Sequence, residues 1–137
     1  MIDMKENQVV DGDVIDLRAC LMWVDSENIT YQEFKPGVDV SLEDAKEMAR
    51  VRKRLLRSKR GPRLTDIRGV KSTPKAVRDF GQSKEVAQMT TAFAIIVDSP
   101  MTRTLGTIFM QLTRPPYPTR MFTNKDDALK WLRGYLE

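Results

Sequence analysis

The sequence predicts a single α/β domain with a five-stranded, mixed and mostly parallel sheet and about four helices, a βα superhelix. Strand-like and helix-like segments alternate along most of the 137 residues, which is typical of parallel sheets with right-handed crossovers. Residues 91–97 read Thr-Ala-Phe-Ala-Ile-Ile-Val, and such an apolar run suits a strand buried on both sheet faces. A chain of this length can bury a core without disulfides or metals.

The N-terminal part predicts a tail followed by a β-hairpin. Residues 1–16 are polar and acidic, so we expect a frayed tail or a weak extra strand, and the domain itself spans 17–137. Residues 18–25 and 29–34 are rich in apolar, aromatic and β-branched side chains and flank a turn-like Asp-Ser-Glu-Asn segment. Only the first of these two strands should run antiparallel to the rest.

The first helix is expected to follow Ser41. A serine is a good N-cap, and Glu43 and Asp44 lie in the first turn, where the helix dipole favours acids. The last turns are basic, and Gly61-Pro62 is predicted to stop the helix. The apolar stripe at helical spacing comprises Leu42, Ala45, Ala49 and Leu56.

A strand over 63–67 and a helix with a Thr-Pro start come next. We expect Thr73 to be the N-cap, with Pro74 at the first helical position and the helix ending at Gly81. Residues 83–89 predict another turn or two of helix.

Ser99-Pro100, like Thr73-Pro74, is a cap residue followed by proline, and it precedes a helix with a clear apolar stripe. That stripe comprises Met101, Leu105, Ile108, Phe109 and Leu112. Gly106 lies inside the helix and predicts a close backbone contact. A last short strand over 119–122 precedes a final helix, with Thr123 as its expected cap.

Composition excludes several classes of enzyme. The chain has no histidine, which removes Ser-His and Cys-His nucleophiles and most zinc sites. Its one cysteine, Cys20, cannot form an internal disulfide and lies in an apolar run, so we expect an inert core residue. We therefore predict no catalytic residue, no metal and no cofactor. The N-terminus has no signal pattern and no run approaches a bilayer span, so a cytoplasmic location is expected.

Four sequence blocks carry a resemblance to a known group. They are residues 66–71 (DIRGVK), 99–106 (SPMTRTLG), 114–123 (RPPYPTRMFT) and 128–132 (ALKWL). Over roughly residues 17–136 the chain resembles an uncharacterised bacterial family of STAS-like domains. This is the SpoIIAA-like fold of anti-sigma-factor antagonists, related to SEC14-like (CRAL-TRIO) lipid-binding domains.

The resemblance implies a possible phosphorylation switch. In STAS antagonists a kinase-targeted serine starts the helix after the third strand, within an Asp-Ser-Ser/Thr-Gly type motif. Ser72 and Thr73 hold that position here, but the preceding aspartate and the following glycine are absent. We therefore expect both residues to be unmodified in native protein.

Two polar surfaces are candidates for binding. The carboxyl edge of the parallel sheet should gather helix N-termini and anion-binding groups, although helix capping alone also accounts for many of them. Its residues are Arg68, Lys71, Ser72, Thr73, Asp98 and Ser99, with Asp39, Ser41, Thr123 and Asn124 nearby. The second candidate is a basic patch of Arg50, Lys53, Arg54, Arg57, Lys59 and Arg60, which is also typical of a solvated helix end.

Two weaker candidates complete the search. Asp66 and Asp98 fall at strand ends and could bind a metal, but pairing with an arginine or helix capping explains them better. Met110 and Tyr117 lie off the helical stripe and could contact a partner.

These observations favour a non-catalytic regulatory or protein-binding module. We expect a protein partner or self-association. The net charge of +4 and the lack of an interleaved aromatic predict no specific nucleic-acid binding. The alternative is a carrier of a small ligand or lipid, and an enclosed cavity would favour it.

Overall fold

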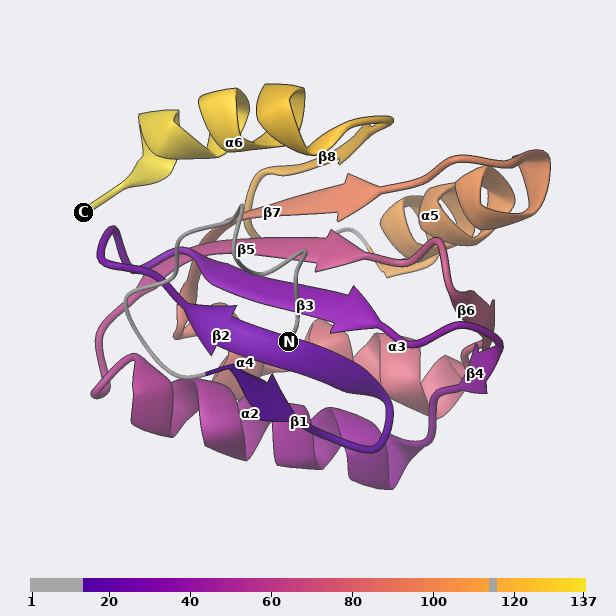
Figure 1. Ribbon diagram of the computed structural model, residues 1–137, viewed down its shortest axis with the longest axis horizontal. Coiled ribbons are helices and arrows are strands. Elements are labelled where there is room, and N and C mark those ends of the chain that lie inside the picture. Colours follow the sequence, from indigo (N-terminus) through magenta and orange to yellow (C-terminus); the bar gives the residue numbers. More distant parts are fainter. Residues whose placement is uncertain (1–13, 114–115) are drawn as a thin grey trace.

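The central sheet of the computed structural model has six strands in the order β1-β2-β3-β5-β7-β8 (Figure 1). Residues 14–113 and 116–137 are described, with backbone alone at 108–113. The strands are β1 (Ile15–Asp16), β2 (Cys20–Val24), β3 (Thr30–Phe34), β5 (Gly61–Asp66), β7 (Thr90–Ile96) and β8 (Thr119–Phe122).

The pairing confirms the predicted fold class. β2 is antiparallel to β3, and β3, β5, β7 and β8 pair in parallel. The two residues of β1 add a sixth strand, antiparallel to β2. A separate two-stranded sheet of β4 (Val38–Asp39) and β6 (Val70–Ser72) was not predicted.

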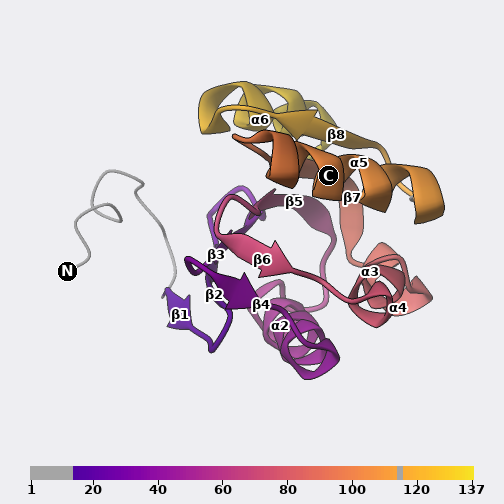
Figure 2. The ribbon, with the colours of Figure 1, turned by 90° about the vertical axis from the view of Figure 1, so that its right-hand side faces the viewer.

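The helices cover the two sheet faces unequally (Figure 2). On one face lie α2 (Leu42–Leu55), α3 (Lys75–Gly81), α4 (Lys84–Ala87) and α5 (Pro100–Thr113). On the other lies α6 (Lys125–Leu132), followed by the 3-10 turn η1 (Arg133–Tyr135). The side chains of Ile108, Phe109, Met110 and Leu112 lie outside the described part of the chain.

Two helix starts confirm the sequence prediction. The Ser41 backbone N–H donates to Asp44 Oδ2 at 2.9 Å, and the Asp44 N–H donates to Ser41 Oγ at 3.2 Å, a reciprocal capping box. Ser99 Oγ accepts from the Thr102 N–H at 3.1 Å. Each interaction satisfies an N–H that the helix itself leaves unpaired.

Two other predicted caps are wrong. Helix α3 begins at Lys75, so Pro74 is the N-cap residue and Thr73 provides no cap. Helix α6 begins at Lys125, where Asn124 accepts from the Asp127 N–H at 2.9 Å, so the cap lies one residue after Thr123.

The predicted stop at Gly61-Pro62 is also wrong. Helix α2 ends at Leu55, and Arg57 and Ser58 take left-handed conformations with φ of 53° and 64°. The Ser58 N–H bonds the Lys53 carbonyl at 3.2 Å, which closes the helix end as a Schellman motif does. Gly61 instead opens β5, where an added Cβ would lie 2.1 Å from the Asn28 carbonyl oxygen.

Gly106 confirms a close approach, although its neighbours are side chains. A Cβ there would lie 2.6 Å from Met121 Sδ and 3.6 Å from a methyl of Val97. The glycine therefore lets α5 lie close to the β7–β8 side of the sheet.

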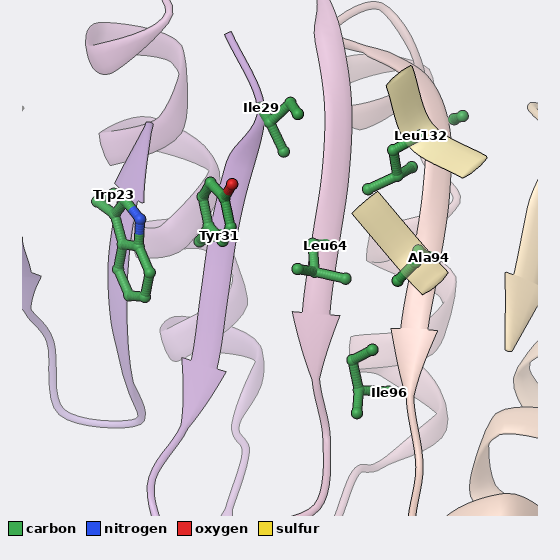
Figure 3. Close-up of a cluster of buried hydrophobic side chains, with 9 residues drawn as sticks. Trp23, Ile29, Tyr31, Leu64, Ala94, Ile96 and Leu132 are labelled. Atoms are coloured by element: carbon green, nitrogen blue, oxygen red, sulfur yellow. The ribbon is translucent and has the colours of Figure 1, made fainter. Parts of the chain in front are cut away.

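The face under α6 is filled by aromatic and aliphatic side chains (Figure 3). The rings of Trp23 and Tyr31 stack with centroids 5.0 Å apart and planes 7° apart. Leu64 and Ala94 continue the layer toward Leu132 of α6, and all five side chains are buried. Residues at alternating strand positions therefore build this layer, as expected of a pleated sheet.

Cys20 is buried on the opposite face, as predicted for a core residue. Burial raises the pKa of its thiol to about 12. The protonated thiol is a poor nucleophile at neutral pH.

Candidate functional site

Most of the predicted carboxyl-edge residues already have hydrogen-bond partners within the protein. Ser72 lies in β6 and donates its hydroxyl to Asp39 Oδ1 at 2.6 Å. Arg68 forms a two-pronged bond to Asp66, with Nε and Nη2 at 2.9 and 2.7 Å from the two carboxylate oxygens. The hydrogen bond to Asp66 raises the pKa of Arg68. The positive charge of Arg68 is therefore already paired with the carboxylate of Asp66.

The remaining edge residues serve the backbone or face solvent. Asp98 accepts from the Thr102 hydroxyl at 3.3 Å beside the Ser99 cap. The Thr73 carbonyl accepts from Arg78 Nη1 at 2.7 Å, and Lys71 is exposed. Across residues 14–113 and 116–137, no group of three or more acidic or cysteine side chains is placed to hold a metal ion.

Whether Ser72 or Thr73 is phosphorylated stays a prediction. A phosphate on Ser72 would replace its bond to Asp39 and face that carboxylate, a like charge. We keep the expectation that Ser72 and Thr73 are unmodified, and peptide mass spectrometry on native protein would check it.

The basic patch is exposed along the C-terminal end of α2 and the loop after it. All six of its side chains, Arg50, Lys53, Arg54, Arg57, Lys59 and Arg60, are exposed. Arg60 lies 3.4 Å from Glu137. The expectation of weak, salt-sensitive nucleic-acid binding follows from this cluster of exposed charges, which has no other support, and stays a prediction.

A cavity of about 110 Å³ lies between the sheet and the helices α2, α3 and α4. Most of its wall is apolar, with Met48 from α2, Phe80 from α3 and Met89 before β7 among the lining residues. Helix α3, which forms part of this wall, has no fully buried residue. Arg52 and Arg63 also line the cavity, and both are buried, with exposed fractions of 1% and 8%.

Arg52 reaches from α2 to the amino ends of three parallel strands. Its Nε donates to Thr30 Oγ1 at 2.9 Å, and its Nη1 donates to Thr90 Oγ1 at 2.7 Å. Its Nη2 donates to the carbonyls of Gly61 and Met89, each at 3.1 Å. All four acceptors are neutral, so the hydrogen bonds are satisfied while the charge is not compensated.

Arg63 projects from β5 onto the same sheet face. Its guanidinium carbon lies 3.8 Å from the Phe93 ring centroid, a cation–π contact. Its Nη2 donates to the Tyr117 hydroxyl at 3.2 Å, and that hydroxyl donates to the Gly81 carbonyl at 2.8 Å. The Nε of Arg63 is buried and has no hydrogen-bond partner in the described part of the chain.

No acidic side chain lines the cavity within the described residues. Burial lowers the pKa of both arginines, and Arg63 lowers that of Arg52 further by repulsion. Buried charges normally have a partner, because an isolated buried ion is costly. The cavity therefore combines an apolar wall with uncompensated positive charge.

Sequence reasoning missed both arginines. Arg52 lies among the basic residues of the last turns of α2, yet it follows Met48 and Ala49 by four and three residues, so the helical period places it on the buried face. Arg63 lies in a strand with a parallel neighbour on each side. A charged residue in a central strand of the sheet is the sequence signal that could have indicated a buried arginine.

Comparison with solved structures identifies the class of fold. An uncharacterised protein of the DUF3478 family from Shewanella loihica PV-4, with a SpoIIAA-like fold, superposes with a TM-score of 0.60. The two share 21% sequence identity over 88% of this chain and 99% of that one. The protein therefore has a SpoIIAA-like, or STAS-like, fold, which confirms the predicted resemblance.

The family is given by the sequence itself. Residues 22–136 match the family described as domain of unknown function DUF7793, and the chain belongs to that family. A protein of unknown function from Arthrobacter sp. FB24 shares 22% identity over 86% of this chain and 95% of that one, with a TM-score of 0.33. None of the curated proteins matches this sequence.

The helices were also compared with the length of a membrane span. Within the described ranges, none is long and apolar enough to cross a bilayer.

Proposed function

We propose that the protein is a non-catalytic ligand-binding domain that takes a small molecule into the cavity between the sheet and α2, α3 and α4. The cavity itself carries this proposal. Its volume of about 110 Å³ compares with the roughly 150 Å³ of an apolar cavity that binds benzene. Close packing is the norm in protein interiors, so a void of this size next to buried polar groups supports a binding role.

The volume also limits the kind of ligand. Pockets for drug-sized molecules measure about 300–1,000 Å³, so a long lipid is a poor fit to about 110 Å³. Of the two ligands that the sequence suggests for a carrier, a small molecule and a lipid, we therefore propose the small molecule.

The protein-binding role has less support. Among the described side chains, the exposed large apolar ones are Met101 and Leu136, and these belong to different elements. Binding through a protein partner stays a prediction, and ligand binding in the cavity is compatible with it.

A cavity-filling substitution tests the proposal. Ala49 lines the cavity from α2, so Ala49→Leu should fill part of it and weaken binding of small apolar compounds at least tenfold. Binding is measured by isothermal titration calorimetry with a panel of four- to six-carbon carboxylates, alcohols and amides. The matched control is Ala76→Leu, an exposed position of α3 outside the cavity lining.

The proposal fails if no member of the panel binds the unmodified protein. It also fails if Ala49→Leu, shown to be folded by circular dichroism, binds as tightly as Ala76→Leu. A second filling variant, Ala45→Leu, serves if Ala49→Leu does not fold, because Ala45 lines the same cavity.

A further inference from the structure

We infer that the ligand is a short-chain monocarboxylate whose carboxylate binds the guanidinium of Arg63. This inference rests on the proposed function and adds the charge and the anchoring residue. Four independent features of the cavity lead to it.

The first feature is the free donor. Arg63 is 8% exposed, lines the cavity and has a buried Nε without a partner among the described residues. Leaving a buried donor unpaired costs more than an average hydrogen bond contributes. The protein therefore leaves this guanidinium only partly hydrogen-bonded, and an anion beside it would offset its charge.

The second feature is rigidity. The Phe93 ring at 3.8 Å and the Tyr117 hydroxyl at 3.2 Å hold the guanidinium on two sides. The tyrosine is in turn held by the Gly81 carbonyl at 2.8 Å. A guanidinium held in this way binds a carboxylate with little loss of rotamer entropy, because its planar fork is already oriented.

The third feature is charge. Arg52, Arg63 and the half-buried Arg78 all line the cavity, and no aspartate or glutamate does so within the described residues. Among the described residues, the hydrogen-bond partners of Arg52 and Arg63 are hydroxyls and carbonyls. A single anion in the cavity would offset part of this charge, whereas a neutral or cationic ligand would not.

The fourth feature is the balance of apolar wall and volume. Apolar side chains such as Met48, Val77, Phe80 and Ile95 form most of the lining, so the ligand needs an apolar body beside its charged end. A space of about 110 Å³ is smaller than one that holds the six carbons of benzene. Aliphatic acids of about four or five carbons are close to benzene in size and use the apolar wall, whereas a phosphate or sulfate ion would leave that wall unused.

Binding of pentanoate and pentanamide to the full chain at pH 7 tests the inference. The two compounds share their shape, but only pentanoate carries a charge. We expect pentanoate to bind at least tenfold more tightly by calorimetry, because charge-assisted hydrogen bonds are about twice as strong as neutral ones. With methyl-labelled methionine, the NMR signals of Met48 and Met89, which line the cavity, should shift, while that of the exposed Met101 should not.

The variant Arg63→Met tests whether Arg63 binds the carboxylate. This variant should lose the preference for pentanoate over pentanamide, whereas Arg54→Met, at an exposed position of α2, should keep it. The wild-type comparison needs no variant, so it decides the question of charge even if Arg63→Met does not fold.

Each outcome separates the two proposals. Equal binding of pentanoate and pentanamide, with shifts at Met48 and Met89, would overturn the anionic ligand and leave the proposed function intact. A preference for pentanoate that persists in folded Arg63→Met would overturn the role of Arg63. Absence of binding by every carboxylate, alcohol and amide of the panel would overturn both.

Discussion

The two faces of the central sheet are packed in opposite ways. Under α6, stacked rings and aliphatic side chains fill the space, and all members of that cluster are buried (Figure 3). Between the other face and α2, α3 and α4 lie two buried arginines, Arg52 of α2 and Arg63 of β5, and a cavity of about 110 Å³. The difference teaches that the two faces divide their roles unequally. Both faces bury apolar side chains, but within the described residues only the face under α2, α3 and α4 also keeps buried arginines and open space.

The largest expected effect lies on the filled face. Leu132→Ala, at a fully buried position of α6, should lower the free energy of unfolding by about 3 kcal/mol, because its neighbours cannot close the space. Val77→Ala, at a half-buried position in the cavity wall, should cost about 1 kcal/mol or less. Urea unfolding of both variants gives the comparison. Equal costs would show that the two faces are packed alike.

Acid should weaken the α2 side by a mechanism that the α6 side does not share. The hydrogen bond from Arg18 lowers the pKa of Asp44 from 3.8 to about 2, with further bonds from Ser41. The carboxylate therefore stabilises the fold fully above about pH 4, and this contribution is lost as the pH falls toward 2. By pH 3 the loss should be about 1 kcal/mol.

Urea unfolding between pH 7 and pH 3 measures this loss. Asp44→Asn should be less stable at pH 7 and should lack this part of the acid dependence. Asp126→Asn, at an exposed position of the first turn of α6, should show the same acid dependence as the unmodified protein. If Asp44→Asn shows it too, the Arg18–Asp44 pair does not carry the effect.

The smallest expected effects distinguish two similar helix starts. Ser99→Ala should cost about 1 kcal/mol, because it removes the cap of α5. Thr73→Ala should change stability by less than about 0.5 kcal/mol, since Thr73 does not cap α3. Thermal unfolding with matched scan conditions resolves the two. A cost at Thr73 equal to that at Ser99 would contradict the observed start of α3.

Those two starts also show what the sequence could predict. Both are a hydroxyl residue followed by proline, but the residue three positions later differs. Thr102 Oγ1 accepts a hydrogen bond from the Ser99 N–H and lies in hydrogen-bond contact with Ser99 Oγ. Ala76, which stands in the same place after Thr73, has no polar side chain. Asn124 and Asp127 form a reciprocal pair of the same kind. The residue three positions on would have corrected the start at Thr73 but not the one at Thr123, because Asp126 follows Thr123 just as Asp127 follows Asn124.

The order of the main elements and the parallel sheet were predictable because apolar periodicity and helix caps carry that information locally. Strands β1 and β4 have only two residues each, too few to show a period. The cavity was not predictable, because it depends on side chains that the chain brings together from distant positions. Arg52 and Arg63 looked like ordinary basic residues until the helix face and the central strand placed them inside.

The hydrogen bonds of Arg52 have a consequence for the kinetics of folding. The residues that accept them at Thr30, Met89 and Thr90 lie 22, 37 and 38 positions away along the chain. They come together only when the crossovers from β3 to β5 and from β5 to β7 are both closed, and such long-range closures form late. Loss of this side chain should therefore accelerate unfolding far more than it slows folding, with a φ-value near zero. In a stopped-flow experiment, Arg52→Met should raise the unfolding rate constant and leave the refolding rate constant almost unchanged.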